Sequence, residues 1–146
     1  MTTRAGDLGA AVREIEHTAD VGIEVEAPTL PLLFERAGIA TLGLMLDLDT
    51  LAPRERAVIA LEADGLEELL HDWLQALLVR LQAGGLAFTE LTVEDIDARA
   101  IHASGAGERV DPSRHRLYTE LKGVTYHQLE VRETPQGWWA RVIFDV

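Results

Sequence analysis

Two aspartates at opposite ends of the chain, Asp20 and Asp145, are the side chains best placed to do chemistry. Asp145 lies in an apolar C-terminal segment, beside Val146 and the terminal carboxylate. Negative charges crowded in this way repel one another unless a cation lies between them. If the C-terminal strand pairs with the strand after Asp20, both carboxylates and an oxygen of Val146 converge on one ion. An all-oxygen set suits a hard cation such as Ca²⁺ or Mg²⁺.

Asp20 also has a purely structural interpretation. It precedes Gly22 in a segment expected to turn between two strands, where an aspartate often hydrogen-bonds its own backbone. His17 and His127 could ligate a transition metal, but they lie on different segments and in no spaced cluster of His or Cys. The sequence therefore favours oxygen ligands over a zinc or iron site.

Lys122 is the only lysine of the chain, against 12 arginines. A lone ammonium in that background suggests a role that a planar guanidinium fills badly, because lysine is a compact point charge. Chance placement is an equally good explanation for a single residue. The remaining candidates are weaker. We expect His102 and His115 to lie in loops or on the surface. We expect Asp72, on a helix, to face solvent or a partner.

The composition excludes several classes of protein. A chain of 146 residues, 47% of them hydrophobic, fits one soluble globular domain. The net charge of −12 argues against direct binding of nucleic acid and favours a monomer whose surface suits cations or basic proteins. The absence of cysteine excludes disulfides and thiolate zinc sites. No apolar run could span a membrane and no secretion signal is present, so we expect a cytoplasmic protein.

Two amphipathic helices must position these residues. The first is expected from a cap at Thr29 to about Met45, where apolar positions repeat with helical spacing. The second has a longer apolar face, over residues 66–81, and ends at Gly84 and Gly85. Asp64 stands three residues before Glu67, which is the spacing of a capping box.

The remaining segments alternate with the period of strands. Strands are expected at residues 12–16, 23–25, 57–62 and 88–101, and a hairpin at 129–133 and 138–144. The stretch that starts at residue 88 is expected to stop at residues 104–107, before a polar loop over 108–116. This pattern predicts a single α+β domain, residues 12–146, with two main helices packed on a mostly antiparallel sheet. Residues 1–11 are expected to form a flexible tail.

Four separated motifs, in the same order, resemble those of the archease family. They are His17-Thr18-Ala19-Asp20, Leu70-His71-Asp72-Trp73-Leu74, Lys122-Gly123-Val124-Thr125-Tyr126-His127 and Phe144-Asp145-Val146. The resemblance covers residues 12–146. It departs from the family pattern at Gly123, where alanine is commoner, and at Gln128, where glycine is usual.

The resemblance implies a protein that is not itself an enzyme. Archeases are cofactors of the RtcB-type RNA ligase of tRNA splicing, and they promote its GTP-dependent guanylylation and repeated turnover. The resemblance places a divalent cation, with Ca²⁺ favoured and Mg²⁺ or Mn²⁺ as alternatives, on Asp20, Asp145 and the main chain of Val146. The candidates for contacts with the ligase or its nucleotide are His17, Asp72, Lys122 and His127.

Two other classes of function stay open on the sequence. A metal-dependent hydrolase could use Asp20 and Asp145, with His17 or His127, around an activated water. That class predicts turnover by the isolated chain. A general acidic chaperone or protein-binding module would hold basic clients without any chemistry, and without dependence on GTP or an RNA ligase.

Overall fold

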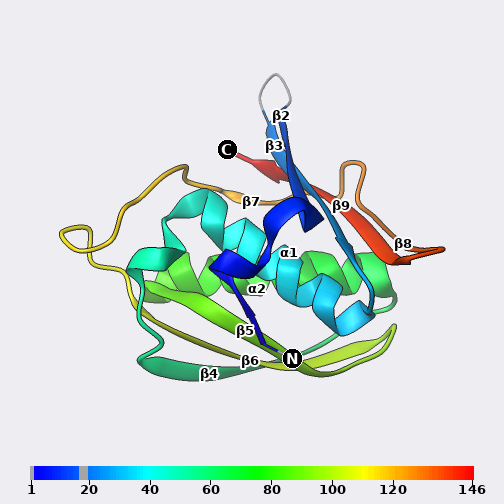
Figure 1. The fold of residues 1–146 in the computed structure, drawn as a ribbon, viewed down its shortest axis with the longest axis horizontal. Coiled ribbons are helices and arrows are strands. Elements are labelled where there is room, and N and C mark those ends of the chain that lie inside the picture. Colours follow the sequence, from blue (N-terminus) through cyan, green and yellow to red (C-terminus); the bar gives the residue numbers. More distant parts are fainter. Residues whose placement is uncertain (1, 17–19) are drawn as a thin grey trace.

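The computed structural model describes residues 2–16 and 20–146, and there it shows two α-helices held between two antiparallel sheets (Figure 1). The first sheet has the strand order β1-β5-β6-β4, and the second has the order β2-β3-β9-β7 with β8 also paired to β9. The strands are β1 Thr2–Arg4, β2 Val12–Glu16, β3 Asp20–Ala27, β4 Glu55–Glu62, β5 Leu86–Ile96, β6 Ala100–Arg109, β7 Gly123–Val124, β8 Glu130–Thr134 and β9 Gly137–Asp145.

Both predicted helices are confirmed. Helix α1 spans Leu30–Met45, and the N–H of Leu32 donates to Oγ1 of its cap residue Thr29 at 3.4 Å. Helix α2 spans Leu66–Gly84 and ends where Gly85 adopts the left-handed conformation, with φ +69°. Glycine reaches that conformation without the steric cost of a Cβ, so the chain can leave the helix there.

The capping box expected at Asp64 is wrong. Helix α2 begins one residue later than expected, so Gly65 is its cap residue and no side chain bonds the free N–H groups there. The carboxylate of Asp64 instead lies 3.5 Å from the guanidinium of Arg99, and that of Glu67 accepts the N–H of Val131 at 2.9 Å. Glu67 therefore ties α2 to the second sheet instead of closing its own helix.

Strand β6 does not stop at its glycines, as the sequence suggested, but continues to Arg109. A Cβ at Gly105 would lie 2.6 Å from the ring of Phe88 on β5, so the glycine lets the aromatic ring pack against the neighbouring strand. Glycine here serves close approach and not a turn. The expected polar loop accordingly begins after Arg109.

The hydrophobic core lies on both sides of the helices, between the two sheets. Its largest fully buried side chains come from every layer: Phe34 on α1, Trp73 on α2, Phe88 on β5 and Phe144 on β9. The indole N–H of Trp73 donates to the carbonyl of Phe34 at 2.9 Å and so links the two helices. The predicted α+β class and antiparallel pairing are confirmed, while the division of the strands into two sheets was not predicted.

Residues 2–11 differ from the flexible tail expected for them. Strand β1 pairs with the edge of β5, and the hydroxyl of Thr3 donates to the buried carboxylate of Glu35 at 2.7 Å. The second oxygen of Glu35 accepts the N–H of Val93 at 2.8 Å. Burial raises the pKa of Glu35 above its usual 4.5, against the lowering effect of these donors. Across the described residues, no helix has the length and apolarity needed to cross a membrane.

Candidate functional site

The two aspartates predicted to share a cation are direct partners in the second sheet. In the antiparallel pairing of β3 with β9, Asp20 lies opposite Asp145. On the other side of β9, Asp145 also lies opposite Gly123 of β7. Side chains of directly opposed residues emerge on the same face, with Cβ atoms about 4.5–5.5 Å apart. The structure therefore brings Asp20, Asp145 and the segment after Lys122 into one row.

This row lies at the end of the sheet and on its outer side. Phe144 is fully buried toward the helices, so the neighbouring Asp145 faces away from them, and it is exposed. Asp20 is half-buried, and Val146 is 43% exposed. Like charges directly opposite each other in a sheet are destabilising. The arrangement is therefore one that a cation would stabilise.

The donor set fits a hard cation but is incomplete as a cage of side chains. In the part of the chain that the structure describes, no group of three or more His, Cys, Asp or Glu side chains is close enough to hold a metal. Two carboxylates and an oxygen of Val146 would leave several positions to water, as Mg²⁺ and Ca²⁺ permit. His17, the further candidate, lies outside the described residues.

Lys122 is held beside these carboxylates by its own backbone. Its N–H donates to the carbonyl of Asp145 at 2.8 Å, while its side chain is exposed. One residue beyond β7, the N–H of Thr125 donates to the carbonyl of Ile143 at 3.0 Å. The segment that carries the single lysine is thus fixed along β9, and the lysine side chain is exposed.

Helix α2 supplies side chains that bind the outer edge of β7. Both main-chain groups of Val124 are taken: Gln75 Oε1 accepts its N–H and His71 Nε2 donates to its carbonyl, each at 3.0 Å. One helical turn separates His71 from Gln75, so the two side chains stand one above the other. Further along the helix, the amide of Gln82 donates to the carbonyl of Leu121 at 2.7 Å. Three side chains therefore replace a neighbouring strand.

Asp72 and Tyr126 join the same cluster through His71. Nδ1 of His71 is hydrogen-bonded to Oδ1 of Asp72 at 2.9 Å, and the ring stacks on that of Tyr126, with 4.0 Å between centroids and 10° between planes. Partial burial, then the negative charges of Asp72 and Glu68, raise the pKa of Tyr126 above its usual 10. The Asp72 and Lys122 motifs, 50 residues apart, are thus physically connected.

His127 is less engaged than the other candidates. It is exposed, and its backbone N–H donates to Oγ1 of Thr125 at 3.2 Å. The sequence reasoning singled out Asp72 and His127 but missed Gln75 and Tyr126. The position of Gln75, one turn after His71 on the face that carries the motif, was the available signal.

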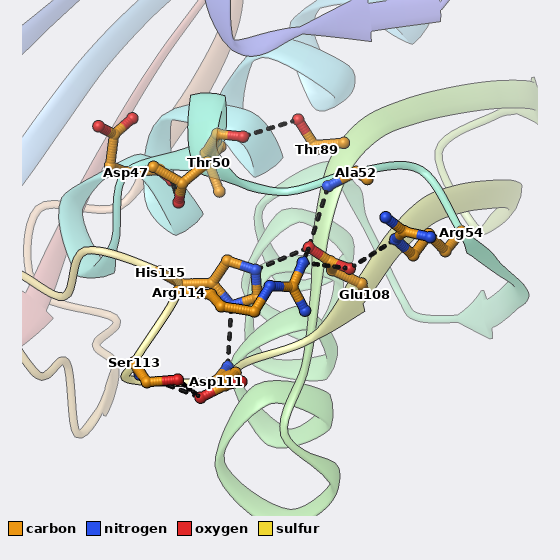
Figure 2. Close-up of polar contacts among 11 residues, drawn as sticks. Asp47, Thr50, Ala52, Arg54, Thr89, Glu108, Asp111, Ser113, Arg114 and His115 are labelled. Atoms are coloured by element: carbon orange, nitrogen blue, oxygen red, sulfur yellow. Dashed lines mark hydrogen bonds and ion pairs between the residues drawn. The ribbon is translucent and has the colours of Figure 1, made fainter.

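A second polar cluster lies between β6 and the loop after it (Figure 2). His115 was expected in a loop or on the surface, but its side chain is fully buried, and Nε2 lies 2.7 Å from Oε1 of Glu108. Nδ1 accepts the N–H of Asp111 at 2.8 Å. Burial opposes ionisation of Glu108, but His115, the Ala52 amide and Arg114 together hold its pKa below 4.5. The buried pair of Glu108 and His115 therefore ties the loop after β6 to the end of that strand.

Comparison with known proteins gives one consistent result. A model of the Archease protein family (MTH1598/TM1083) matches residues 13–146. The chain is similar to "Protein archease" of Methanopyrus kandleri, with 37% identity over 91% of this chain and 97% of the relative. Its counterpart in Methanosarcina acetivorans is 34% identical over 94% of this chain and 97% of the relative.

Two solved structures have the same fold. The solution structure of Methanobacterium thermoautotrophicum protein 1598 has a TM-score of 0.77 and 25% identity, over 93% of this chain and 99% of that one. A crystal structure from Thermotoga maritima, described as an archease and possible chaperone, has a TM-score of 0.65 and 20% identity, over 92% and 96%.

Proposed function

This chain belongs to the archease family, and from that membership we propose that it is a non-catalytic activator of an RtcB-type RNA ligase. The observation that carries the proposal is the meeting of separate motifs at one end of the second sheet. Asp20 and Asp145 lie opposite each other in the sheet. The backbone N–H of Lys122 donates to the carbonyl of Asp145, and a side chain of α2 bonds β7, the strand after Lys122. Exposed charges on a rigid frame suit a protein that acts on another protein's active site.

The charges of this site match the chemistry of guanylyl transfer. When bound by Asp20, Asp145 and Val146, a divalent cation would supply positive charge for a nearby phosphate. Lys122 presents a point charge that can meet a phosphate oxygen or an acidic group of the ligase. Transfer of GMP from GTP to the ligase needs its phosphate charge compensated, and the net charge of −12 favours docking on a basic surface.

The test is RNA ligation by the cognate ligase with GTP and a divalent metal, with this protein present or absent. We expect the wild-type chain to convert a single turnover per ligase into many. Asp20→Asn and Asp145→Asn should remove that gain while keeping the fold, because an amide relieves the repulsion between opposed carboxylates. Asp64→Asn, at an aspartate whose side chain is 86% exposed at the start of α2, is the matched control and should stimulate normally.

The alternatives give different results in the same assay. If Asp20→Asn and Asp145→Asn stimulate as well as the wild type, the carboxylates are not part of the working site. A chaperone without chemistry would protect the ligase from inactivation but would not change its turnovers in the presence of GTP. A hydrolase would instead turn over substrate with no ligase in the reaction.

A further inference from the structure

Tyr126 is an exposed aromatic side chain that the structure holds rigidly with one ring face open. Its exposed fraction is 61%, although one face is stacked on His71. His71 is itself held at both ring nitrogens, by Val124 and Asp72. A ring fixed before a partner arrives loses little conformational entropy on binding, which is a property of residues that dominate interfaces.

Two other aromatic rings, the exposed Tyr118 and the half-buried Trp139, already have a guanidinium over them. The guanidinium of Arg116 lies 5.5 Å from the ring centroid of Tyr118, and that of Arg132 lies 4.2 Å from Trp139. Within residues 2–16 and 20–146, no guanidinium lies over Tyr126 in the same way. The ring is therefore open to a cation from outside the chain.

Two carboxylates, Asp72 and Glu68, lie near Tyr126. Asp72 lies against the stacked pair, because Oδ1 bonds the histidine ring, and Glu68 stands one helical turn before it on α2. Partial burial, and after it the charges of Asp72 and Glu68, raise the pKa of Tyr126. An aromatic face beside carboxylates attracts a cation through the ring quadrupole and through ion pairing.

Elsewhere in this chain an arginine already binds an aromatic ring and a carboxylate together, which is the arrangement we consider for Tyr126. Arg132 places its guanidinium over Trp139 and at the same time forms an ion pair with Glu130, with 2.7 Å between Nη1 and Oε2. A planar guanidinium can stack on a ring and bond a carboxylate together, whereas an ammonium is a point charge without a face. The chemistry at Tyr126 accordingly favours arginine over lysine.

We propose that Tyr126, Glu68 and Asp72 form a docking site for an arginine side chain of a protein partner. That this partner is the RNA ligase rests on the proposed function. That the site binds arginine rests on the contacts and charges around Tyr126 alone. Phosphate groups are disfavoured here, because the carboxylates repel them and the chain has a net charge of −12. The docked arginine would lie beside the segment that carries Lys122, and so align the two proteins at the candidate site.

The first experiment measures the affinity of the full chain for the ligase, by calorimetry, for matched tyrosine variants. Tyr126→Ala should weaken binding about tenfold or more, as loss of a central aromatic contact does. Tyr126→Phe keeps the ring and should bind within about twofold of the wild type. Tyr118→Ala, at the other half-exposed tyrosine, is the control and should leave the affinity unchanged.

The carboxylate part of the site is tested at Glu68, which does not bond His71. Glu68→Gln should weaken binding about threefold or more at low salt, and the difference should shrink as salt screens the charge. Wild-type affinity in Tyr126→Ala, or equal losses in Tyr126→Ala and Tyr118→Ala, would overturn the proposal.

A second experiment needs no ligase. The full chain is titrated with the peptide Gly-Arg-Gly, blocked at both ends, and with its lysine and citrulline counterparts and GMP, while NMR follows the Tyr126 ring protons. We expect the arginine peptide to shift them most and citrulline and GMP to leave them in place. A larger response to GMP would identify a base-stacking site and overturn the proposal. If only the peptide binds, the proposed ligase partner is wrong and the docking site stands.

Discussion

Gln128 has a backbone conformation that a residue with a side chain rarely adopts. Its φ is +54°, and among the described residues it is the one non-glycine residue in the left-handed region. Its carbonyl accepts Nε–H of Arg141 at 3.0 Å, which helps to hold the turn between β7 and β8 in place. The resemblance described above implies glycine at this position, and the backbone supplies a reason, because glycine enters this region without the steric cost of a Cβ.

We expect Gln128→Gly to raise the free energy of unfolding by about 0.5–1 kcal/mol. Relief of a left-handed residue, about 1–2 kcal/mol, exceeds the entropy that glycine adds to the unfolded chain, about 0.5–1 kcal/mol. Urea denaturation measures the difference. Gln136→Gly, in the turn between β8 and β9 but without a positive φ, is the control and should be neutral or destabilising. A stabilisation at both positions would show that strain at Gln128 is not the cause.

Glu35 gives a pH dependence of known sign. Its pKa is raised in the folded state, so its contribution to stability is greatest below the unfolded value of 4.5 and is lost as pH rises through the folded value. In Glu35→Gln, the amide oxygen can accept from Val93 and the amide N–H can donate to Thr3. We therefore expect this variant to be more stable than the wild type at pH 7, with the gain shrinking below pH 4.5.

At Glu108 we expect the opposite pH dependence of stability, so this residue serves as the internal control. Its folded pKa is lowered, so its contribution is present above pH 4.5 and is lost as pH falls through the folded value. Glu108→Gln should cost stability at pH 7 and cost less in acid. Urea midpoints between pH 3 and 8 test both variants. If the two show the same slope against pH, the assignment of raised and lowered pKa values is wrong.

At the scale of elements, the edge of β7 depends on helix α2. A two-residue strand has few hydrogen bonds of its own, and β7 pairs with β9 over only Gly123 and Val124. Gln75 and His71 supply what a further strand would supply, and they leave the outer edge of the sheet closed to other chains. The position of Lys122 is thus set through its neighbours Leu121 and Val124, which bond side chains of α2.

We expect Gln75→Met to speed hydrogen exchange of the Val124 amide by about tenfold while costing about 1 kcal/mol of global stability. Methionine has a similar shape but lacks the oxygen that accepts this N–H. Gln75→Glu keeps an acceptor and should retain the protection of the amide. Amide exchange followed by NMR tests both. Equal exchange rates in the two variants would show that the hydrogen bond does not hold β7.

At the scale of the whole molecule, the N-terminal segment closes the first sheet. Strand β1 covers the edge of β5, and Thr3 on it is buried although it is polar. Its hydroxyl bonds a carboxylate on α1, so the segment links a sheet to the central layer. The candidate site lies in the other sheet, on strands that β1 does not pair with.

Deletion of residues 2–11 should therefore lower stability without removing function. We expect a loss of about 1–3 kcal/mol or more, the cost of leaving a buried acceptor without its donor, together with the lost pairing of β1. Thr3→Val removes only the hydroxyl and should reproduce part of this loss. Ligase stimulation, measured well below the melting temperature, should persist in both variants. Loss of stimulation in a folded deletion variant would place the N-terminal segment in the functional site.

The sequence by itself determined the local features of this protein. Helical and alternating periodicity identified α1, α2 and the β8–β9 hairpin, because burial of one face imposes those periods on any chain. Crowded charge singled out Asp145, and four motifs indicated the family. Local patterns were wrong where distant packing decides: Gly105 serves the ring of Phe88 instead of a turn, and Asp64 lies one residue too early to cap α2.

Only the tertiary structure decided which of these features meet. The register of β3 on β9 places Asp20 opposite Asp145, and a shift of one residue would send the side chains of either strand to the other face. The attachment of Val124 to Gln75 and His71 depends on how α2 packs between two sheets, which no local pattern encodes. Contacts between residues far apart in the chain arise from the packing of whole elements. The sequence therefore identifies the residues of the candidate site, whereas the fold determines how they meet.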